Sequence, residues 1–421
     1  MTPILTQNYF RIYLIILGLI SALLPAVEVL KVKALSFAFI LLVVWFLITG
    51  DWHNKWKRLK ENRLAWLLGA LYLINLVSFT YSDNPTYALD LLVRKMPILF
   101  FPFIVAASPT LPKQYVNKLA AVFVISLLIT SLYTYRDGIA PLLERNDLTE
   151  LVRLVPMHRP YLGMFSAFAI IISLSFALNC KNVLAKLIAS SVAFYFLWYI
   201  YVIYAKMTVV ALLVLGITIG LIYLFKKFHT YVALLVVLAV FSGIITYLST
   251  SEQATIVYKK VIALEDFSYD EYNIHLVSSI NIRYINWGCS IKILNQDKTW
   301  FTGLGLGDSQ EKLLSCYKEL NPWIYEQRHN AHNEYLEETL RNGIIGLMIL
   351  LACLIVPLSL CIYHKYYVCL SFILLFGICC LSESILSRQA GIMFYAFFSS
   401  LYILNSLRSL NGAKKPTLIH N

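Results

Sequence analysis

Apolar runs of about twenty residues, each bounded by charged or turn residues, recur along the chain. An α-helix needs about 20 predominantly apolar residues to cross the hydrocarbon core of a bilayer. The pattern predicts about twelve spans, at residues 12–30, 34–49, 64–79, 91–107, 119–135, 161–178, 187–204, 207–225, 231–248, 343–363, 367–386 and 390–407. The span at 91–107 is irregular, since it holds Arg94, Lys95 and two prolines, and we interpret it as kinked or partly interfacial. The pattern therefore predicts an all-α polytopic membrane protein.

One connection, residues 249–341 between the ninth and tenth spans, is far longer than the others. Long loops in compact proteins are usually functional. This segment divides the chain into a first membrane region of about nine helices (1–248), a mainly helical catalytic loop (249–341), and a second membrane region of about three helices with a tail (342–421). We see no internal repeat that would suggest another division.

Composition supports the membrane class. The chain is 59% hydrophobic and 14% charged, whereas a soluble domain carries about 25% charged residues. Its net charge is +12, which could suggest nucleic acid, but residues 249–341 hold nine Lys and Arg against thirteen Asp and Glu, a net of −4. The remaining +16 lies on the membrane body and its short loops. The basic excess is therefore mainly a topology signal.

The basic residues also predict the orientation, because Lys and Arg are retained on the cytoplasmic side. The connection at 51–63, the pair Lys226–Lys227, and the tail from Arg408 to Lys415 alternate with sparsely basic loops. We expect these basic segments and both termini in the cytoplasm, with the first helix retained and the long loop outside, although Arg136, Arg145 and Arg153 fall on the other side.

The densest polar segment of the long loop is 328–338, which contains His329, His332 and Glu334. Leu336, Leu340 and Ile344 recur at helical spacing, so we expect a surface helix that continues into the next span. His332 at its water boundary is suited to exchanging a proton near neutral pH. The alternatives are a solvated polar face with an incidental histidine, and a metal site formed by His329, His332 and Glu334.

Two further groups in the loop could bind phosphate or sugar. Residues 278–296 are expected to form a helix with Arg283 and Trp287 one turn apart, and Arg283 could meet phosphate oxygens or form an ordinary surface ion pair, for example with Asp297. The glycines of the segment 302–309, Gly305 among them, allow a tight turn; a glycoside could approach its backbone closely, or the turn could be only a turn.

Cations also precede two of the spans on the outer side, Arg159 before the sixth and Lys206 between the seventh and eighth. Such residues bind substrate or merely reach lipid headgroups. Of the eight cysteines, Cys289 and Cys316 lie in the long loop and are either paired there as a staple or free, and Cys353, Cys361, Cys369, Cys379 and Cys380 are interpreted as small buried residues of the spans.

Three motifs in the long loop occur in a definite order. They are Asn281-Ile282-Arg283 with Trp287, then Trp300-Phe301-Thr302-Gly303-Leu304-Gly305-Leu306-Gly307, then Ala331-His332-Asn333-Glu334-Tyr335-Leu336 followed by Asn342-Gly343-Ile344-Ile345-Gly346. Together with twelve spans and one large loop, this combination resembles the O-antigen ligase and polymerase superfamily.

The resemblance implies a GT-C-like membrane glycosyltransferase that works without a metal or other cofactor. The implied donor is a glycan on undecaprenyl pyrophosphate, and the acceptor in the ligases is a sugar of lipid A-core. The implied location is the bacterial inner membrane, with the active site facing the periplasm. By the same resemblance, Arg283 and His332 are the catalytic residues, while Arg159, Lys206, Trp287, Asn333 and Gly305 bind the pyrophosphate or the glycan.

The motifs and the predicted spans are compatible with three functions. The first is an O-antigen ligase, which motif order and loop size favour modestly. The second is an O-antigen polymerase that extends the lipid-linked glycan. The third is not an enzyme but a transporter or flippase of lipid-linked glycans; it would predict charges deep within several spans, whereas the intramembrane charges are few (Arg94, Lys95 and Glu383).

Overall fold

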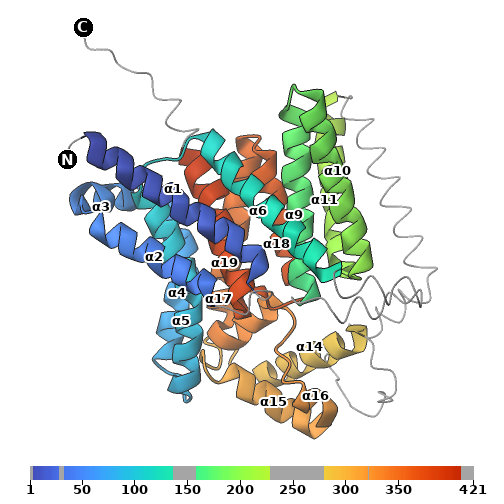
Figure 1. The fold of residues 1–421 in the computed structure, drawn as a ribbon. Helices are drawn as coiled ribbons and strands as arrows, with labels where there is room; N and C mark the ends of the chain where they lie inside the picture. Colours follow the sequence, from blue (N-terminus) through green and yellow to red (C-terminus); the bar gives the residue numbers. More distant parts are fainter. Residues whose placement is uncertain (1–2, 28–32, 136–157, 228–278, 321, 409–421) are drawn as a thin grey trace.

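The computed structural model describes residues 3–27, 33–135, 158–227, 279–320 and 322–408. Within these ranges the chain is helical and forms no strand. Most of the helices stand side by side in a bundle, and α14 (Ser279–Gln296), α15 (Ser309–Leu320) and α16 (Pro322–Glu326) lie together at one end of it (Figure 1). The all-α fold class expected from the sequence is confirmed.

The first part of the bundle consists of α1 (Pro3–Ala26), α2 (Ala34–Ile48), α3 (Trp52–Glu61), α4 (Arg63–Phe79), α5 (Pro85–Ala107), α6 (Lys113–Tyr135), α9 (Arg159–Asn179), α10 (Val183–Val202) and α11 (Lys206–Lys227). The last part consists of α17 (Glu334–Tyr363), α18 (Tyr367–Cys380), a 3₁₀ turn (Ile385–Ser387), α19 (Gln389–Phe398) and a π-helical continuation (Ser399–Asn405).

Seven of the described helices are long and apolar enough to cross a membrane, or eight if the bent pair α2 and α3 counts as one span. The helices α4 and α18 are apolar but shorter. The chain is therefore a multi-pass membrane protein, as predicted. The expected span at 231–248 lies outside the described residues, so the count of twelve stays a prediction.

Two segments differ from the sequence-based expectation. Residues 51–63, expected to be a loop, contain the helix α3, which turns 113° away from α2. The eleventh span was expected to reach residue 386, but α18 ends at Cys380, and residues 381–388 leave the helix. The irregular span at 91–107 belongs to one 23-residue helix, α5, with Pro97 and Pro102 inside it, and its kinked or interfacial character stays a prediction.

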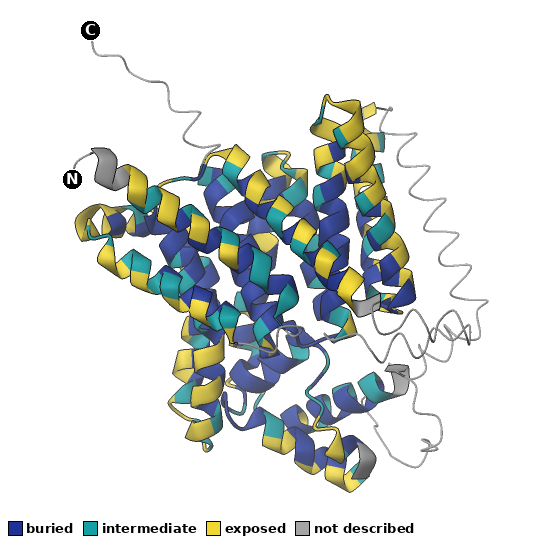
Figure 2. Cartoon of the chain, in the orientation of Figure 1, coloured by how far each residue is buried: buried dark blue, intermediate teal, exposed yellow. Residues whose placement is uncertain are grey.

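The core of the bundle is aromatic and surrounds α19. Phe394 packs on Phe165 with ring centroids 4.6 Å apart, and Phe168 packs on Phe398 at 4.8 Å. Almost all residues of the stretch Gln389–Arg408 are buried within the molecule, whereas few residues of α10 and α11 are buried (Figure 2). The last predicted span is thus enclosed by protein, and α10 and α11 face outward.

The two ends of the bundle differ in chemistry. At one end Arg58 donates to the Ala107 carbonyl at 2.6 Å, and Arg408 donates to the Val105 carbonyl at 2.9 Å. The start of α1 lies at the same end, because Trp45 donates to the Tyr9 carbonyl. We call this the basic end. The helices α14 (Ser279–Gln296), α15 (Ser309–Leu320) and α16 (Pro322–Glu326) cover the opposite end (Figure 1).

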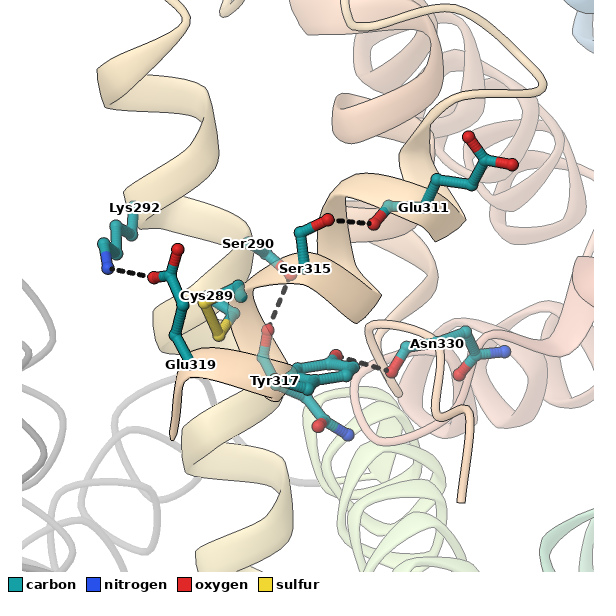
Figure 3. Close-up of a disulfide and its surroundings, with 10 residues drawn as sticks. Cys289, Ser290, Lys292, Glu311, Ser315, Tyr317, Glu319 and Asn330 are labelled. Carbon is teal, nitrogen blue, oxygen red and sulfur yellow. Dashed lines mark hydrogen bonds and ion pairs between the residues drawn. A yellow bond between two sulfur atoms is a disulfide. The ribbon is translucent and has the colours of Figure 1, made fainter. Parts of the chain in front are cut away.

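A disulfide between Cys289 and Cys316 joins α14 to α15, which resolves the pairing that the sequence left open (Figure 3). Around it, Lys292 pairs with Glu319 at 3.5 Å, and a small apolar core packs between the two helices. Cys361 and Cys369 are buried, as expected, and they also form a second disulfide, between α17 and α18, which the sequence analysis did not anticipate.

The glycine-rich turn after α14 docks against a break in α17. Gly343 interrupts that helix with φ 63° and ψ −163°, and the Ile344 amide just beyond it donates to the Trp300 carbonyl at 2.7 Å. Leu304 and Gly305 donate in turn to the carbonyls of Leu340 and Arg341. The break separates a polar first segment of α17, residues 334–342, from its apolar remainder.

Candidate functional site

The candidate site begins where the chain enters α17. Asn333 is the N-cap of this helix, and its side-chain oxygen accepts from the amides of Tyr335 at 2.9 Å and Leu336 at 3.2 Å. Such a cap satisfies amides that the first helical turn leaves without a partner. His332 directly before it has φ 48°, a left-handed conformation that costs free energy in a non-glycine residue. The chain thus adopts a left-handed conformation at His332, directly before the helix begins.

His332 is paired with a carboxylate from a distant segment. Its Nδ1 lies 3.2 Å from Oε2 of Glu383, and the exposed fractions of the two side chains are 17% and 3%. If Nδ1 carries the proton and donates to the carboxylate, Nε2 is left as the free proton acceptor. The imidazole is thus oriented by one nitrogen and partly accessible.

Arg283 reaches the same place from α14. Its Nε donates to the Ser382 carbonyl at 3.0 Å, next to Glu383 in sequence. Burial alone would raise the pKa of the Glu383 carboxyl, but its hydrogen bond with His332, followed by the neighbouring His158 and Arg283, lowers that pKa below its ordinary value. Glu383 is therefore held as a carboxylate, facing a histidine and a fixed cation.

Two further histidines border the pair. The His329 ring packs edge-on against His332, with centroids 4.9 Å apart. Burial, and then the neighbouring His332, lower the pKa of His329 to about 4. Burial also lowers the pKa of His158, at the start of α9, against the opposing effect of Glu383. Both flanking rings are therefore neutral near pH 7.

Glu383 lies in the turn 381–388 between α18 and α19, which other elements hold from behind. The Tyr161 hydroxyl of α9 donates to the Ser384 carbonyl at 3.2 Å. The Leu386 amide donates to Glu334 at 2.6 Å, and Ser384 Oγ donates to Glu337 at 3.3 Å. These contacts explain why α18 ends before residue 386. Polar groups of the turn form hydrogen bonds with side chains of α9 and α17 in place of hydrogen bonds within a helix.

The first segment of α17 carries an unusual buried polar stripe. Glu334, Glu337 and Glu338 are each 0% exposed, Arg341 is 1% exposed and Asn342 is 2% exposed. These residues recur at helical spacing and so share one face. Glu337 pairs with Arg341 at 2.5 Å, and Glu338 pairs with Lys95 of α5 at 2.6 Å. Buried charges persist only when paired in this way.

Lys95 was among the irregular features of the predicted span at 91–107. Its side chain is 0% exposed, and besides Glu338 it donates to the Asn75 side chain of α4 at 3.0 Å. Asn342 completes the group by donating to Glu338 at 2.6 Å. Lys95 of α5 thus connects α4 and α17, through Asn75 and Glu338, behind the site.

Arg159 and Lys206, which were also expected from the sequence to bind substrate, begin the helices α9 and α11. Arg159 begins α9 next to His158, and its charge lowers the pKa of that histidine. Lys206 begins α11 and is exposed. The starts of these two helices lie close, because a Cβ at Gly163 would come within 2.6 Å of the Ala205 side chain. Arg159 therefore lies beside the cluster, next to His158, while Lys206 begins the neighbouring helix and its role at the site stays a prediction.

Trp287 lies one turn beyond Arg283 on α14, and its indole N–H is buried with no hydrogen-bond partner among the described residues. Gly305 has φ 108°, and a Cβ there would meet the Asp308 carboxylate at 2.5 Å. That carboxylate accepts from the amides of Asp83 and Asn84 at 3.0 and 2.8 Å. Gly305 therefore packs the turn against the α4–α5 connection, and its binding role stays a prediction.

Sequence reasoning missed Glu383 as a site residue. The available signal was a carboxylate within an apolar run, flanked by serines at 382, 384 and 387, because ionisable residues inside spans commonly mark functional sites. The metal alternative is not supported, since His329, His332 and Glu334 do not form a group that could hold a metal ion in the part of the chain that the structure describes.

The fold and the site define a multi-pass helical membrane protein with a His, Glu and Arg cluster at the end opposite its basic end. Residues 191–351 match the family model described as O-antigen ligase. This segment includes both Arg283 and His332, and the match supports the O-antigen ligase and polymerase superfamily that the motifs resemble, a family of membrane glycosyltransferase-like enzymes. No curated protein matches the chain.

Proposed function

We propose that the protein is an O-antigen ligase, which transfers a glycan from undecaprenyl pyrophosphate to a sugar of lipid A-core. The observation that carries the proposal is the contact of His332 with Glu383, 3.2 Å apart, beside Arg283. It combines a proton acceptor and a fixed cation in one place. Both are needed when a hydroxyl displaces a pyrophosphate.

In the proposed reaction the acceptor hydroxyl attacks the anomeric carbon, and the bond from that carbon to the pyrophosphate oxygen breaks. The hydroxyl proton passes to His332 Nε2, and Glu383 stabilises the imidazolium that forms. The bonding electrons leave with the pyrophosphate. Because this is a single displacement, we expect the anomeric configuration to invert.

Arg283 is the proposed partner of the leaving group. A fixed guanidinium stabilises negative charge as it develops, with little reorganisation. We propose that the exposed cations Arg159 and Lys206 attract the same anion, and that Trp287, one turn beyond Arg283 on α14, lies beside the bound glycan. Asn333 acts through the backbone, since it caps the helix that follows His332.

The proposed location follows from the two ends of the bundle. Positive charge is retained in the cytoplasm, which assigns Arg58 and Arg408 of the basic end to that side. The site then faces the periplasm across the inner membrane. A lipid-linked donor already carried across the membrane would meet it there.

The test is complementation of a deletion strain, with His332→Ala and Arg283→Ala compared against wild type. We expect both variants to lose transfer, so that the lipopolysaccharide consists of bare lipid A-core while lipid-linked polymer accumulates. Lipid A-core carrying a single repeat unit would instead indicate a polymerase. Full complementation by both variants would contradict the site.

A further inference from the structure

One carboxylate oxygen connects the two halves of the His332–Glu383 pair. Oε2 of Glu337 accepts from the amide of Ala331 at 2.9 Å and from Ser384 Oγ at 3.3 Å. Ala331 is the residue before His332, and Ser384 is the residue after Glu383. The two segments are far apart in sequence, and a single atom holds both.

The second oxygen of Glu337 is also fixed. Oε1 pairs with Arg341 at 2.5 Å, one turn further along α17. Arg341 also donates to Ser387 Oγ at 3.2 Å, and Ser387 lies near the end of the 381–388 turn that carries Glu383. Glu337 is 0% exposed and Arg341 is 1% exposed. The carboxylate thus contacts the chain before α17 and the turn before α19 through Oε2, and the cation Arg341 through Oε1.

We propose that Glu337 is a positioning residue that sets the distance between His332 and Glu383. The inference rests on the proposed function, since it assigns His332 the role of base. Glu337 itself does not touch the imidazole. It acts by tying the loop before α17 to the turn before α19, so that the carboxylate and the ring meet at hydrogen-bond distance.

The neighbouring residue supplies a matched control. Glu338 is on the same turn of α17, is equally buried, and is also paired with a cation, Lys95. Among the described residues its side chain accepts hydrogen bonds from Lys95 and Asn342, and neither of these residues belongs to the His332 loop or to the 381–388 turn. Replacing it removes a buried charge pair of the same kind without releasing either segment.

The experiment compares Glu337→Gln, Glu337→Ala and Ser384→Ala with Glu338→Gln in purified full-length protein, using lipid-linked glycan and lipid A-core. We expect kcat to fall about 100-fold in Glu337→Ala, since small displacements of reacting groups have effects of this size, with KM near the wild-type value. Ser384→Ala, which removes one arm of the bridge, should fall by less. Glu338→Gln should reduce the yield of folded protein while leaving the kcat of the folded fraction close to wild type.

A double-mutant cycle distinguishes positioning from a loss of fold. The effects of Glu337→Ala and Glu383→Ala on kcat should be non-additive, since both substitutions act through the one contact between His332 and Glu383. A substitution that only weakened the fold would instead add its effect to that of Glu383→Ala.

A wild-type kcat in Glu337→Ala would overturn the inference, and so would additive effects of Glu337→Ala and Glu383→Ala. These outcomes differ from failure of the proposed function, which would appear as no glycan transfer by the wild-type protein, or as transfer unaffected by His332→Ala.

Discussion

Replacing Glu383 with glutamine removes the charge that faces His332 while keeping the length of the side chain. We expect kcat for glycan transfer to fall about 100-fold, because the imidazolium that forms loses its stabilising partner. Glu319→Gln on α15 is the control, since the Glu319 side chain is 70% exposed. The measurement is the initial rate with purified components, and a Glu383→Gln enzyme as fast as the control would remove Glu383 from the site.

His329 makes the stability of the protein depend on pH. Burial and the neighbouring His332 lower its pKa to about 4, whereas an unfolded histidine has a pKa of about 6.5. The unfolded chain therefore binds the extra proton between these values, and stability falls as the pH drops from about 6.5 towards 4. In His329→Gln the loss of thermal stability over this interval should be smaller. An unchanged slope would assign the acid sensitivity to other groups.

At the residue scale, sequence alone could single out His332 and Arg283 but not what they contact. Their chemistry is visible in the chain, whereas Glu383 joins them only because residues 381–388 leave the helix. That turn depends on bonds from Glu334, Glu337 and Tyr161, on two other helices. Local spacing carries no information on such long-range pairing.

Among the elements, the break in α17 offers a sharp test at Gly343. Its φ of 63° and ψ of −163° fall in a region essentially restricted to glycine, and a Cβ there would collide with the Phe301 carbonyl. Gly343→Ala should lower the stability by about 1–3 kcal/mol and reduce activity, because the polar stripe of residues 334–342 shifts.

The matched control for this substitution is Gly216→Ala on α11, where a Cβ meets nothing within 4 Å. Alanine in an ordinary helix is favoured over glycine by about 0.5–1 kcal/mol. The two variants should therefore move the melting temperature in opposite directions. Equal effects would show that the break in α17 is not strained.

The disulfide between α14 and α15 supports the helix that carries Arg283. Cross-linking Cys289 to Cys316, 27 residues apart, should contribute about 3 kcal/mol by restricting the unfolded chain. A Cys289→Ser and Cys316→Ser double variant should be less stable by this amount, while Cys180→Ser, at a free cysteine, should not. Peptide mapping without reductant should recover residues 289 and 316 linked, and unlinked peptides would refute the bridge.

At the element scale, the sequence predicted helices well where composition decides the outcome. Apolar runs became helices because the membrane requires internally satisfied backbones. The failures occurred at 51–63 and at 381–386. In both segments a charged residue has a tertiary partner, which is the Ala107 carbonyl for Arg58 and His332 for Glu383.

For the molecule as a whole, the proposed orientation can be tested with a native probe. Cys180 is a partly exposed free cysteine that follows α9, at the end of that helix away from the site. A membrane-impermeant maleimide should label it only after the inner membrane is opened. In a Cys180→Ser background, Glu319→Cys on α15 should be labelled while that membrane is intact. The reverse pattern would invert the topology.

The pairing of Lys95 with Glu338 also has a consequence for how the protein is made. The two residues are separated by 243 positions, so the cation of α5 leaves the ribosome long before its carboxylate. Until α17 is synthesised, Lys95 lacks its partner Glu338, and an unpaired charge within a membrane is unfavourable by about 2.5–3.5 kcal/mol on insertion scales. A nascent chain therefore carries an unpaired Lys95 until its C-terminal third is synthesised. In truncated products this unpaired charge is a feature that quality-control proteases can recognise.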